Sequence, residues 1–265
     1  MPDDFFLRHR STVALITGGA QGLGLAIATR LAREGARGLV LGGRNGEKGQ
    51  RAAEGIRALG TECLFVPADV SVPEDCQRLV AAALNHFGTV NGLVNAAAAS
   101  DRGTLLDTSL ELWDRHFHTN ARGPFLLMQG VARHLVDTGQ PGSIVNILSM
   151  VIHCGQSYLT PYSASKGALA TLTKNVANAF AANRIRCNGI AVGWMDTPGE
   201  NATQQKFHGA GEDWLAKAEA AQPMGQLVKP DQVAGLAAYL LSPESGVITG
   251  ALIDYDQRVA GAYPE

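Results

Sequence analysis

Cysteine, net charge and long apolar runs are all scarce in this sequence, and each shortage excludes a class of protein. The four cysteines include no Cys-x-x-Cys pair, so we expect reduced, structural thiols and no metal site. Lys and Arg number 22 against 24 Asp and Glu, a net charge of −2. This balance gives no electrostatic reason to expect nucleic acid or an anionic membrane as a partner.

Signals for membrane insertion, export and domain division are missing too. The apolar stretches end well short of the ~20 residues that span a bilayer. The first ten residues carry acidic groups where a signal peptide needs a positive start and an apolar core. No repeat, low-complexity tract or linker divides the 265 residues. We therefore expect a cytoplasmic protein that folds as a single domain over residues 1–265.

Short apolar runs alternate with helical patterns along the chain. Strands are predicted over residues 12–17, 38–41, 62–67, 92–95, 143–148, 185–191 and 251–254. Helices are predicted over residues 25–34, 47–59, 73–87, 109–117, 121–136, 161–181 and 231–241. This alternation predicts an α/β protein, a single-domain Rossmann-type doubly wound parallel sheet with helices on both faces.

Ser149, Tyr162 and Lys166 form the pattern that most directly suggests chemistry. The helix bearing the last two has Thr160 as its expected N-cap and Pro161 at its first position. Residues four apart share a helix face, so the Lys166 ammonium is expected to lower the Tyr162 pKa from its usual value near ~10. Tyr162 would then transfer protons in alcohol–carbonyl chemistry, and Ser149 would hold the carbonyl oxygen.

A glycine-rich turn follows the first predicted strand. Exposed N–H groups and the positive end of the next helix would face this turn, and glycines let a pyrophosphate approach the backbone. The turn therefore predicts a dinucleotide site, formed by Gly18, Gln21, Gly22, Leu23 and Gly24.

The end of the second predicted strand bears on the choice of cofactor. It carries Arg44 and no carboxylate, whereas NAD sites commonly place an acidic residue on the ribose 2′-hydroxyl. Arginine forms paired hydrogen bonds with phosphate, so the segment favours NADP(H). Alternatively, Arg44 caps the next helix or stacks on adenine, in which case NAD remains possible.

With both motifs in hand, the chain resembles the short-chain dehydrogenase/reductase family over residues 12–254. The resemblance implies that Asn120 joins Ser149, Tyr162 and Lys166 as a fourth catalytic residue. It also implies cofactor contacts in addition to the turn and Arg44, made by Asp69, Val70, Asn95, Tyr162, Lys166, Met195 and Thr197. Relatives commonly assemble as dimers or tetramers, so a homo-oligomer, often a homotetramer, is expected.

Asn120 also has an argument of its own. Pro124 lies four residues later and has no N–H, so in a helix the Asn120 carbonyl would lack its usual partner. A buried carbonyl needs another donor, and a water bridging it to Lys166 would supply one. The alternative is a simple proline kink.

The chain departs from the family pattern in several places, which leaves cofactor affinity and substrate fit open. Ala98 replaces a glycine, Val192 replaces a proline, and the segment 254–256 reads Asp-Tyr-Asp. The polar segment at about residues 199–222 lies where relatives carry a mobile lid over the substrate; the alternative is an ordinary surface helix pair.

The predicted function is an NADP(H)-dependent oxidoreductase that interconverts a small carbonyl compound and its secondary alcohol, with Tyr162 as acid and base. One alternative is an NAD-dependent polyol or sugar dehydrogenase. An alternative of another class is a non-catalytic dinucleotide-binding sensor or scaffold.

Overall fold

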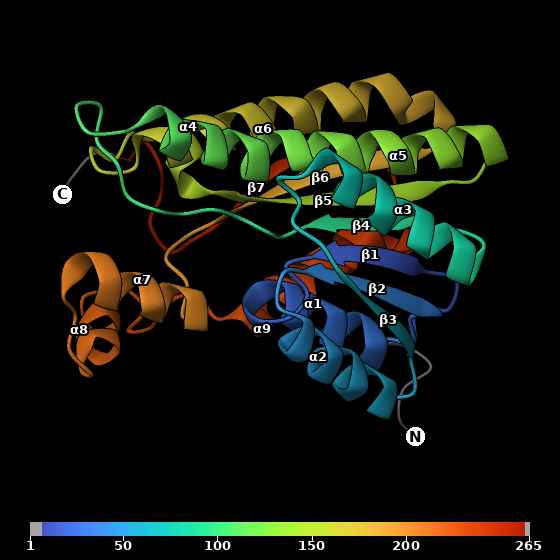
Figure 1. Cartoon of the computed structure of the whole chain (residues 1–265), viewed down its shortest axis with the longest axis horizontal. Helices are drawn as coiled ribbons and strands as arrows, with labels where there is room; N and C mark the ends of the chain where they lie inside the picture. Colours follow the sequence, from blue (N-terminus) through green and yellow to red (C-terminus); the bar gives the residue numbers. More distant parts are fainter. Residues whose placement is uncertain (1–6, 263–265) are drawn as a thin grey trace.

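The computed structural model describes residues 7–262 and contains one seven-stranded sheet. Residues 1–6, which belong to the segment compared above with a signal peptide, and residues 263–265 lie outside the described part. All strand pairs are parallel, in the order β3-β2-β1-β4-β5-β6-β7 (Figure 1). The strands are β1 (Val13–Thr17), β2 (Gly38–Gly43), β3 (Glu62–Pro67), β4 (Gly92–Asn95), β5 (Gly142–Ser149), β6 (Ile185–Val192) and β7 (Leu252–Tyr255).

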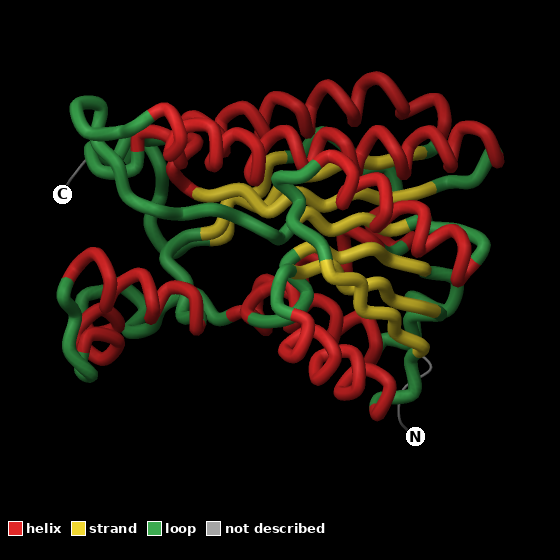
Figure 2. Tube along the Cα trace, in the orientation of Figure 1, coloured by secondary structure: helices red, strands yellow, loops and turns green. Residues whose placement is uncertain are grey.

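Helices cover both faces of this sheet (Figures 1 and 2). One face carries α1 (Gly22–Arg33), α2 (Gly46–Ala58) and α9 (Pro230–Leu241). The other carries α3 (Pro73–Phe87), α5 (Gly123–Thr138) and α6 (Thr160–Phe180), with α4 (Leu110–Phe117) beside α6. Beyond the carboxyl ends of the strands stand α7 (Pro198–His208) and α8 (Trp214–Ala220).

The core consists of two apolar layers separated by the sheet. Successive strand residues face opposite sides, so Ile16 of β1 packs in the layer of α1, whereas Leu15 packs in the layer of α5. Both side chains are fully buried. Burial on both faces explains the continuous apolar runs of the strands and confirms the predicted fold class.

Two local features differ from expectation. The N-cap of α6 is Leu159, so the assignment of Thr160 was wrong by one residue. The reason is tertiary, because the Thr160 N–H donates to the Gly103 carbonyl of a distant loop. Residues 118–122 form a π-helical turn ahead of α5, where one continuous helix was expected from residue 121. The polar segment 199–222 divides into α7 and α8.

The order of the strands determines where a ligand fits. Connections from β1 and β4 leave toward opposite faces, so the sheet has its topological switch point between these strands. Ligands of open parallel sheets bind outside the carboxyl ends of the strands at this point. Within residues 7–262, no helix is long and apolar enough to cross a membrane.

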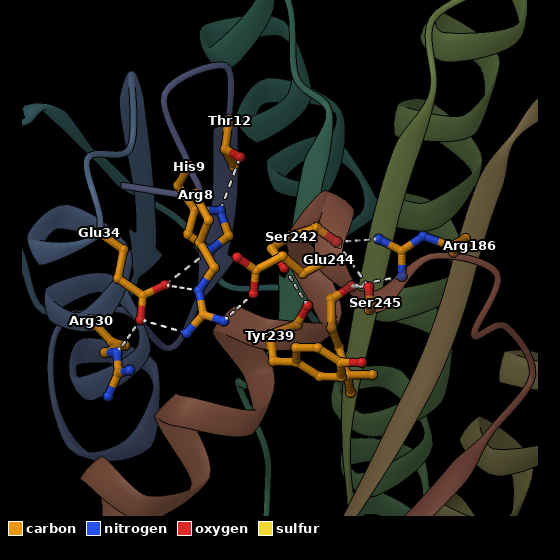
Figure 3. A network of polar contacts seen from close by, with 11 residues as sticks. Arg8, His9, Thr12, Arg30, Glu34, Arg186, Tyr239, Ser242, Glu244 and Ser245 are labelled. Carbon is orange, nitrogen blue, oxygen red and sulfur yellow. Dashed lines mark hydrogen bonds and ion pairs between the residues drawn. The ribbon is translucent and has the colours of Figure 1, made fainter. Parts of the chain in front are cut away.

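At the opposite end of the sheet, a network of charged groups joins the amino-terminal segment to α1 and to the turn after α9 (Figure 3). Arg8 contacts Glu34 at 2.6 Å and Glu244 at 2.8 Å, and Arg30 also pairs with Glu34. Burial alone would raise the pKa of Glu34, but hydrogen bonds from His9, Arg8 and Arg30 outweigh it and hold that pKa well below its usual range.

We expect Glu34→Gln to lower the free energy of unfolding by about 3–5 kcal/mol, because it removes the buried carboxylate that Arg8 and Arg30 share. Glu47→Gln is the control, since Glu47 pairs with Arg51 on the surface, where its side chain is 80% exposed. Denaturant titrations at neutral pH measure the difference, and equal midpoints for the two variants would contradict the prediction.

The same network predicts the direction of the pH dependence. Folding lowers the pKa of Glu34, so its stabilising effect is present above the usual carboxyl value of ~4.3. It is lost as the pH falls from there toward the lowered folded pKa. The stability difference between wild type and Glu34→Gln should therefore shrink in acid.

Candidate active site

Ser149, Tyr162 and Lys166 meet where β5 ends and α6 begins. The hydroxyl of Ser149 is hydrogen-bonded to Tyr162. Lys166 lies one turn further along the same face of α6, with its Nζ 5.8 Å from the centre of the Tyr162 ring. That Nζ also donates a hydrogen bond of 2.7 Å to the Ile147 carbonyl of β5. The structure thus brings the three side chains together as expected.

The protonation states differ from the sequence prediction. Burial raises the pKa of Tyr162, while the hydrogen bond from Ser149 lowers it, the charge of Glu200 raises it and that of Arg102 lowers it. Burial also lowers the pKa of Lys166 to about 8. The expected lowering of the Tyr162 pKa was therefore wrong, because burial is the largest cause and Lys166 is not among the groups that lower this pKa. The phenol is protonated at neutral pH.

Asn120 ties together segments that are far apart in the sequence. Its Oδ1 accepts a hydrogen bond of 2.8 Å from the Ala99 N–H, and its Nδ2 donates to the Ala99 carbonyl at 2.9 Å. Nδ2 also donates to Ser165 Oγ in α6 at 3.0 Å. These contacts of the side chain were not predicted, since nothing in the sequence places Ala99 beside α6.

Pro124, which was expected to deprive the Asn120 carbonyl of its partner, follows a π-helical turn that contains Asn120. Within it, the Gly123 N–H donates to the His118 carbonyl, and Pro124, which has no N–H, follows at once. Single π-helical turns of this kind often occur at functional sites. The predicted water between the Asn120 carbonyl and Lys166 stays a prediction.

The glycine-rich turn between β1 and α1 fits a dinucleotide phosphate. Gly18 and Gly22 have positive φ angles of 68° and 55°, a conformation that favours glycine. A Cβ on Gly24 would clash with the Gly18 carbonyl, so this glycine permits the turn to pack closely on α1. The N-cap residue Gln21 forms no side-chain cap, which leaves the first N–H groups of α1, at Gly22 and Leu23, available to an anion.

Asn95 and Asp69 lie at the ends of β4 and β3. Asn95 Nδ2 donates to Asn146 Oδ1 at 2.8 Å, and its buried Oδ1 has no hydrogen-bond partner among residues 7–262. This unpaired buried oxygen beside the switch point can accept a hydrogen bond from a ligand. Asp69 Oδ1 accepts from the N–H and Oγ of Ser71, so Asp69 shapes the turn, and the neighbouring Val70 is buried.

Met195 and Thr197 lie at the start of the segment that follows β6. Met195 forms a β-bridge with Val228, and Thr197 is the N-cap of α7, with its Oγ1 accepting from the Glu200 N–H at 3.0 Å. A Cβ built on Gly22 would lie 3.9 Å from the Thr197 side chain. The start of α7 therefore adjoins the glycine-rich turn.

Arg44 is exposed after β2 and does not cap the next helix. Asn45 is the cap, with its Oδ1 accepting from the Lys48 N–H at 2.9 Å. The alternative of Arg44 as a helix cap is therefore wrong. The Lys48 Nζ reaches Gln21 Oε1 at 3.2 Å, which places a second cation next to the glycine-rich turn.

The departures from the family pattern have structural counterparts. Val192 is the buried last residue of β6. Asp254 pairs with His153 at 2.7 Å and so joins β7 to the loop after Ser149. The side chain of Asp256 occupies the space where a Cβ on Gly193 would lie. The acidic residues 254 and 256 thus support the loops around the site.

Residues 18–257 match the family model described as enoyl-(acyl carrier protein) reductase. The chain belongs to the short-chain dehydrogenase/reductase family. It is 34% identical over 245 residues to cis-4-hydroxycyclohexanecarboxylate dehydrogenase of Sinomonas cyclohexanicum, covering 92% of this chain and 94% of that relative. Gluconate 5-dehydrogenase of Gluconobacter oxydans is also 34% identical, with 92% of each chain covered.

A solved structure shows the same likeness in three dimensions. A variant of actinorhodin polyketide ketoreductase, solved with NADPH, matches with a TM-score of 0.86 at 31% identity, covering 92% of this chain and 95% of that one. The chain is accordingly an NAD(P)-dependent oxidoreductase that acts on CH–OH or C=O groups. The alternative of a non-catalytic sensor or scaffold was wrong.

Within the described residues, no three His, Cys, Asp or Glu side chains gather as a metal site.

We expect carbonyl reduction to slow as the pH rises through about 8, because Lys166 loses its charge there. Without that charge the phenolate left by proton transfer is less stable. A pH profile of kcat measures this effect. Lys174→Met, at an exposed position of the same helix, should keep the same profile. A rate that stays level through this range would contradict the prediction.

Proposed function

We propose that this protein is an NADP(H)-dependent oxidoreductase that interconverts a small carbonyl compound and its secondary alcohol. The observation that carries the proposal is the phenol of Tyr162, hydrogen-bonded to Ser149 with Lys166 one turn away. This group lies at the carboxyl end of β5, close to the switch point where dinucleotides bind in open parallel sheets.

Each side chain has a role in moving the proton. Tyr162 is protonated at neutral pH, since the pKa of a tyrosine is ordinarily about 10 and burial raises it further, so it donates to the substrate oxygen during reduction. Ser149 holds that oxygen, and Lys166, which Ile147 positions, stabilises the phenolate left behind. The bound nicotinamide supplies the hydride in reduction and accepts it in oxidation.

The basic surface beside the glycine-rich turn supports NADP(H) over NAD. A depression of about 260 Å³ there is lined by Ala20, Leu25, Lys48, Arg51 and Ala52. Within the described chain, Arg44 has neither an ion pair nor a hydrogen bond, so its guanidinium is available to a 2′-phosphate. An NAD-dependent polyol or sugar dehydrogenase is the second candidate, which the similarity to gluconate 5-dehydrogenase favours.

We also propose that α7 and α8 act as the lid. No residue of α7 is buried, so few apolar contacts hold it in place. The indole of Trp214 in α8 packs 6.2 Å from that of Trp194, and its Nε1 donates to Asn201 of α7. The two helices therefore form a small unit attached mainly through the segment after β6.

A homo-oligomer is proposed on the outer surface of α5 and α6. A groove of about 340 Å³ between these helices is mainly apolar and is lined by Phe125, Met128, Gln129, Arg133, Val136, Asp137, Val176 and Phe180. A second copy of the chain, in a dimer or tetramer, would cover it. Sedimentation of the purified protein as a monomer would exclude a homo-oligomer.

The cytoplasmic location stays a prediction from the sequence.

We expect Tyr162→Phe to reduce turnover by at least about 100-fold, because the variant has no phenolic proton to transfer. NADPH should still bind with near-normal affinity, measured by fluorescence titration. Tyr239→Phe is the control, since Tyr239 lies in α9, which covers the opposite face of the sheet from α6. Near-normal turnover in Tyr162→Phe would refute the assignment.

We expect Arg44→Ser to raise the KM for NADPH by about 10-fold, through loss of a charge-assisted hydrogen bond, with a smaller effect on NADH. Arg33→Ser, at the exposed far end of α1, should change neither value. Steady-state kinetics with both cofactors measure the ratio. Equal effects on NADPH and NADH would argue for contact with adenine instead.

A further inference from the structure

Arg102 occupies the loop between β4 and α4, next to the start of the helix that bears Tyr162. The loop pairs with the segment before α6, since the Gly103 N–H donates to the Tyr158 carbonyl at 2.9 Å. The Thr160 N–H in turn donates to the Gly103 carbonyl at 3.0 Å. Two backbone hydrogen bonds therefore fix the position of Arg102 relative to the first turn of α6.

The side chain of Arg102 is only 16% exposed, yet its hydrogen bonds go to neutral acceptors. Nη1 donates to the Ser100 carbonyl at 3.0 Å and Nε donates to His208 Nε2 at 3.3 Å. The guanidinium also lies over the ring of Tyr158, 5.6 Å from its centre. A largely buried cation is more stable beside an anion, which none of these partners provides.

The carboxylate of Glu200, which lies near Arg102, accepts its hydrogen bonds from other residues. Glu200 Oε1 lies 4.0 Å from Arg102 Nη2, beyond hydrogen-bond distance. That oxygen accepts hydrogen bonds from Trp194 Nε1 at 2.8 Å and from Gln204 Nε2 at 2.7 Å. Among residues 7–262, Arg102 Nη2 has no hydrogen-bond acceptor, so one edge of the guanidinium is available to a ligand.

Two neighbouring cations share the carboxylate of Asp101. Lys206 Nζ lies 3.4 Å from Asp101 Oδ1, and Arg115 Nη2 lies 3.2 Å from Asp101 Oδ2. Of these three cations, Arg102 is the one without a carboxylate within hydrogen-bond distance in the described part of the chain. Its charge also reaches the reacting group: burial is the main cause of the raised Tyr162 pKa, but Arg102 lowers this pKa and Glu200 raises it.

We infer that Arg102 binds a carboxylate of the substrate, on the side of its guanidinium where Nη2 has no acceptor among residues 7–262. This inference rests on the proposed function, because the same molecule presents its carbonyl or hydroxyl to Tyr162. The planar guanidinium fork matches a carboxylate, which would replace the weak contact with His208. The substrate is thus a keto acid or hydroxy acid whose two groups are held at the two ends of the site.

The test compares two ketones that differ only at the carboxyl group, the charged 4-oxocyclohexanecarboxylate and its neutral methyl ester, each with NADPH. In Arg102→Gln, kcat/KM for the acid should fall by about 10- to 100-fold, mainly through KM, as expected for a lost hydrogen bond between charged groups. The ester should be little affected. Arg115→Gln, which removes a more exposed arginine of the same region, is the matched control and should leave both ketones unchanged.

A binding measurement makes the result independent of turnover. Cyclohexanecarboxylate, which cannot be reduced, should change the fluorescence of Trp194 and Trp214, since Trp194 contacts Glu200 and both indoles pack together. The change should be absent in Arg102→Gln. Cyclohexyl phosphate serves as the other anion, and its preference over the carboxylate would overturn the choice of ligand.

The outcomes separate this inference from the proposed function. Reduction of both ketones at equal efficiency by the wild type, or an equal loss for both in Arg102→Gln, would overturn the carboxylate site and leave the activity of Tyr162 standing. Binding of cyclohexanecarboxylate that requires Arg102, without reduction of either ketone, would support the site and count against the proposed activity. Absence of both binding and discrimination would overturn the inference.

Discussion

The geometry of the site depends on the hydrogen bonds that the side chain of Asn120 forms. This side chain bonds both backbone groups of Ala99 and reaches Ser165 in α6, so the loop after β4 and the helix after β5 are held by one amide. The loop then bonds the segment before α6 through Gly103. Tyr162 and Arg102 thus belong to one cross-linked unit. An amide suits this position, since it both donates and accepts without carrying a charge into the interior.

The amine of Lys166 has a related constraint. It is almost completely buried, where a cation is costly, and the Ile147 carbonyl is the group that fixes its position. The same burial that lowers the pKa of Lys166 raises that of Tyr162. Both groups therefore remain in their protonated forms near neutrality, which suits donation of a proton to a nascent alkoxide. A site open to water would have kept both pKa values close to their usual positions.

Local sequence was enough to predict the strands, the glycine-rich turn and the triad of Ser149, Tyr162 and Lys166. Those features depend on residue type and on spacing along the chain, and β3, α3 and β4 have the predicted bounds. The pKa of Tyr162 was predicted wrongly because burial comes from packing, which spacing does not reveal. Arg102 was not predicted as a site residue, since its contacts depend on α7, a distant segment that folds back beside it.

Thr197 joins two parts of the molecule that would otherwise be independent. It begins α7, and its side chain stands beside Gly22 in the glycine-rich turn. A molecule that fills the crevice at this turn must either accommodate the first residue of α7 or displace it. Binding in the crevice and the position of α7 are then thermodynamically coupled. The coupling free energy is the same in both directions. Each of the two ligands of such an enzyme would then change the affinity for the other by the same factor.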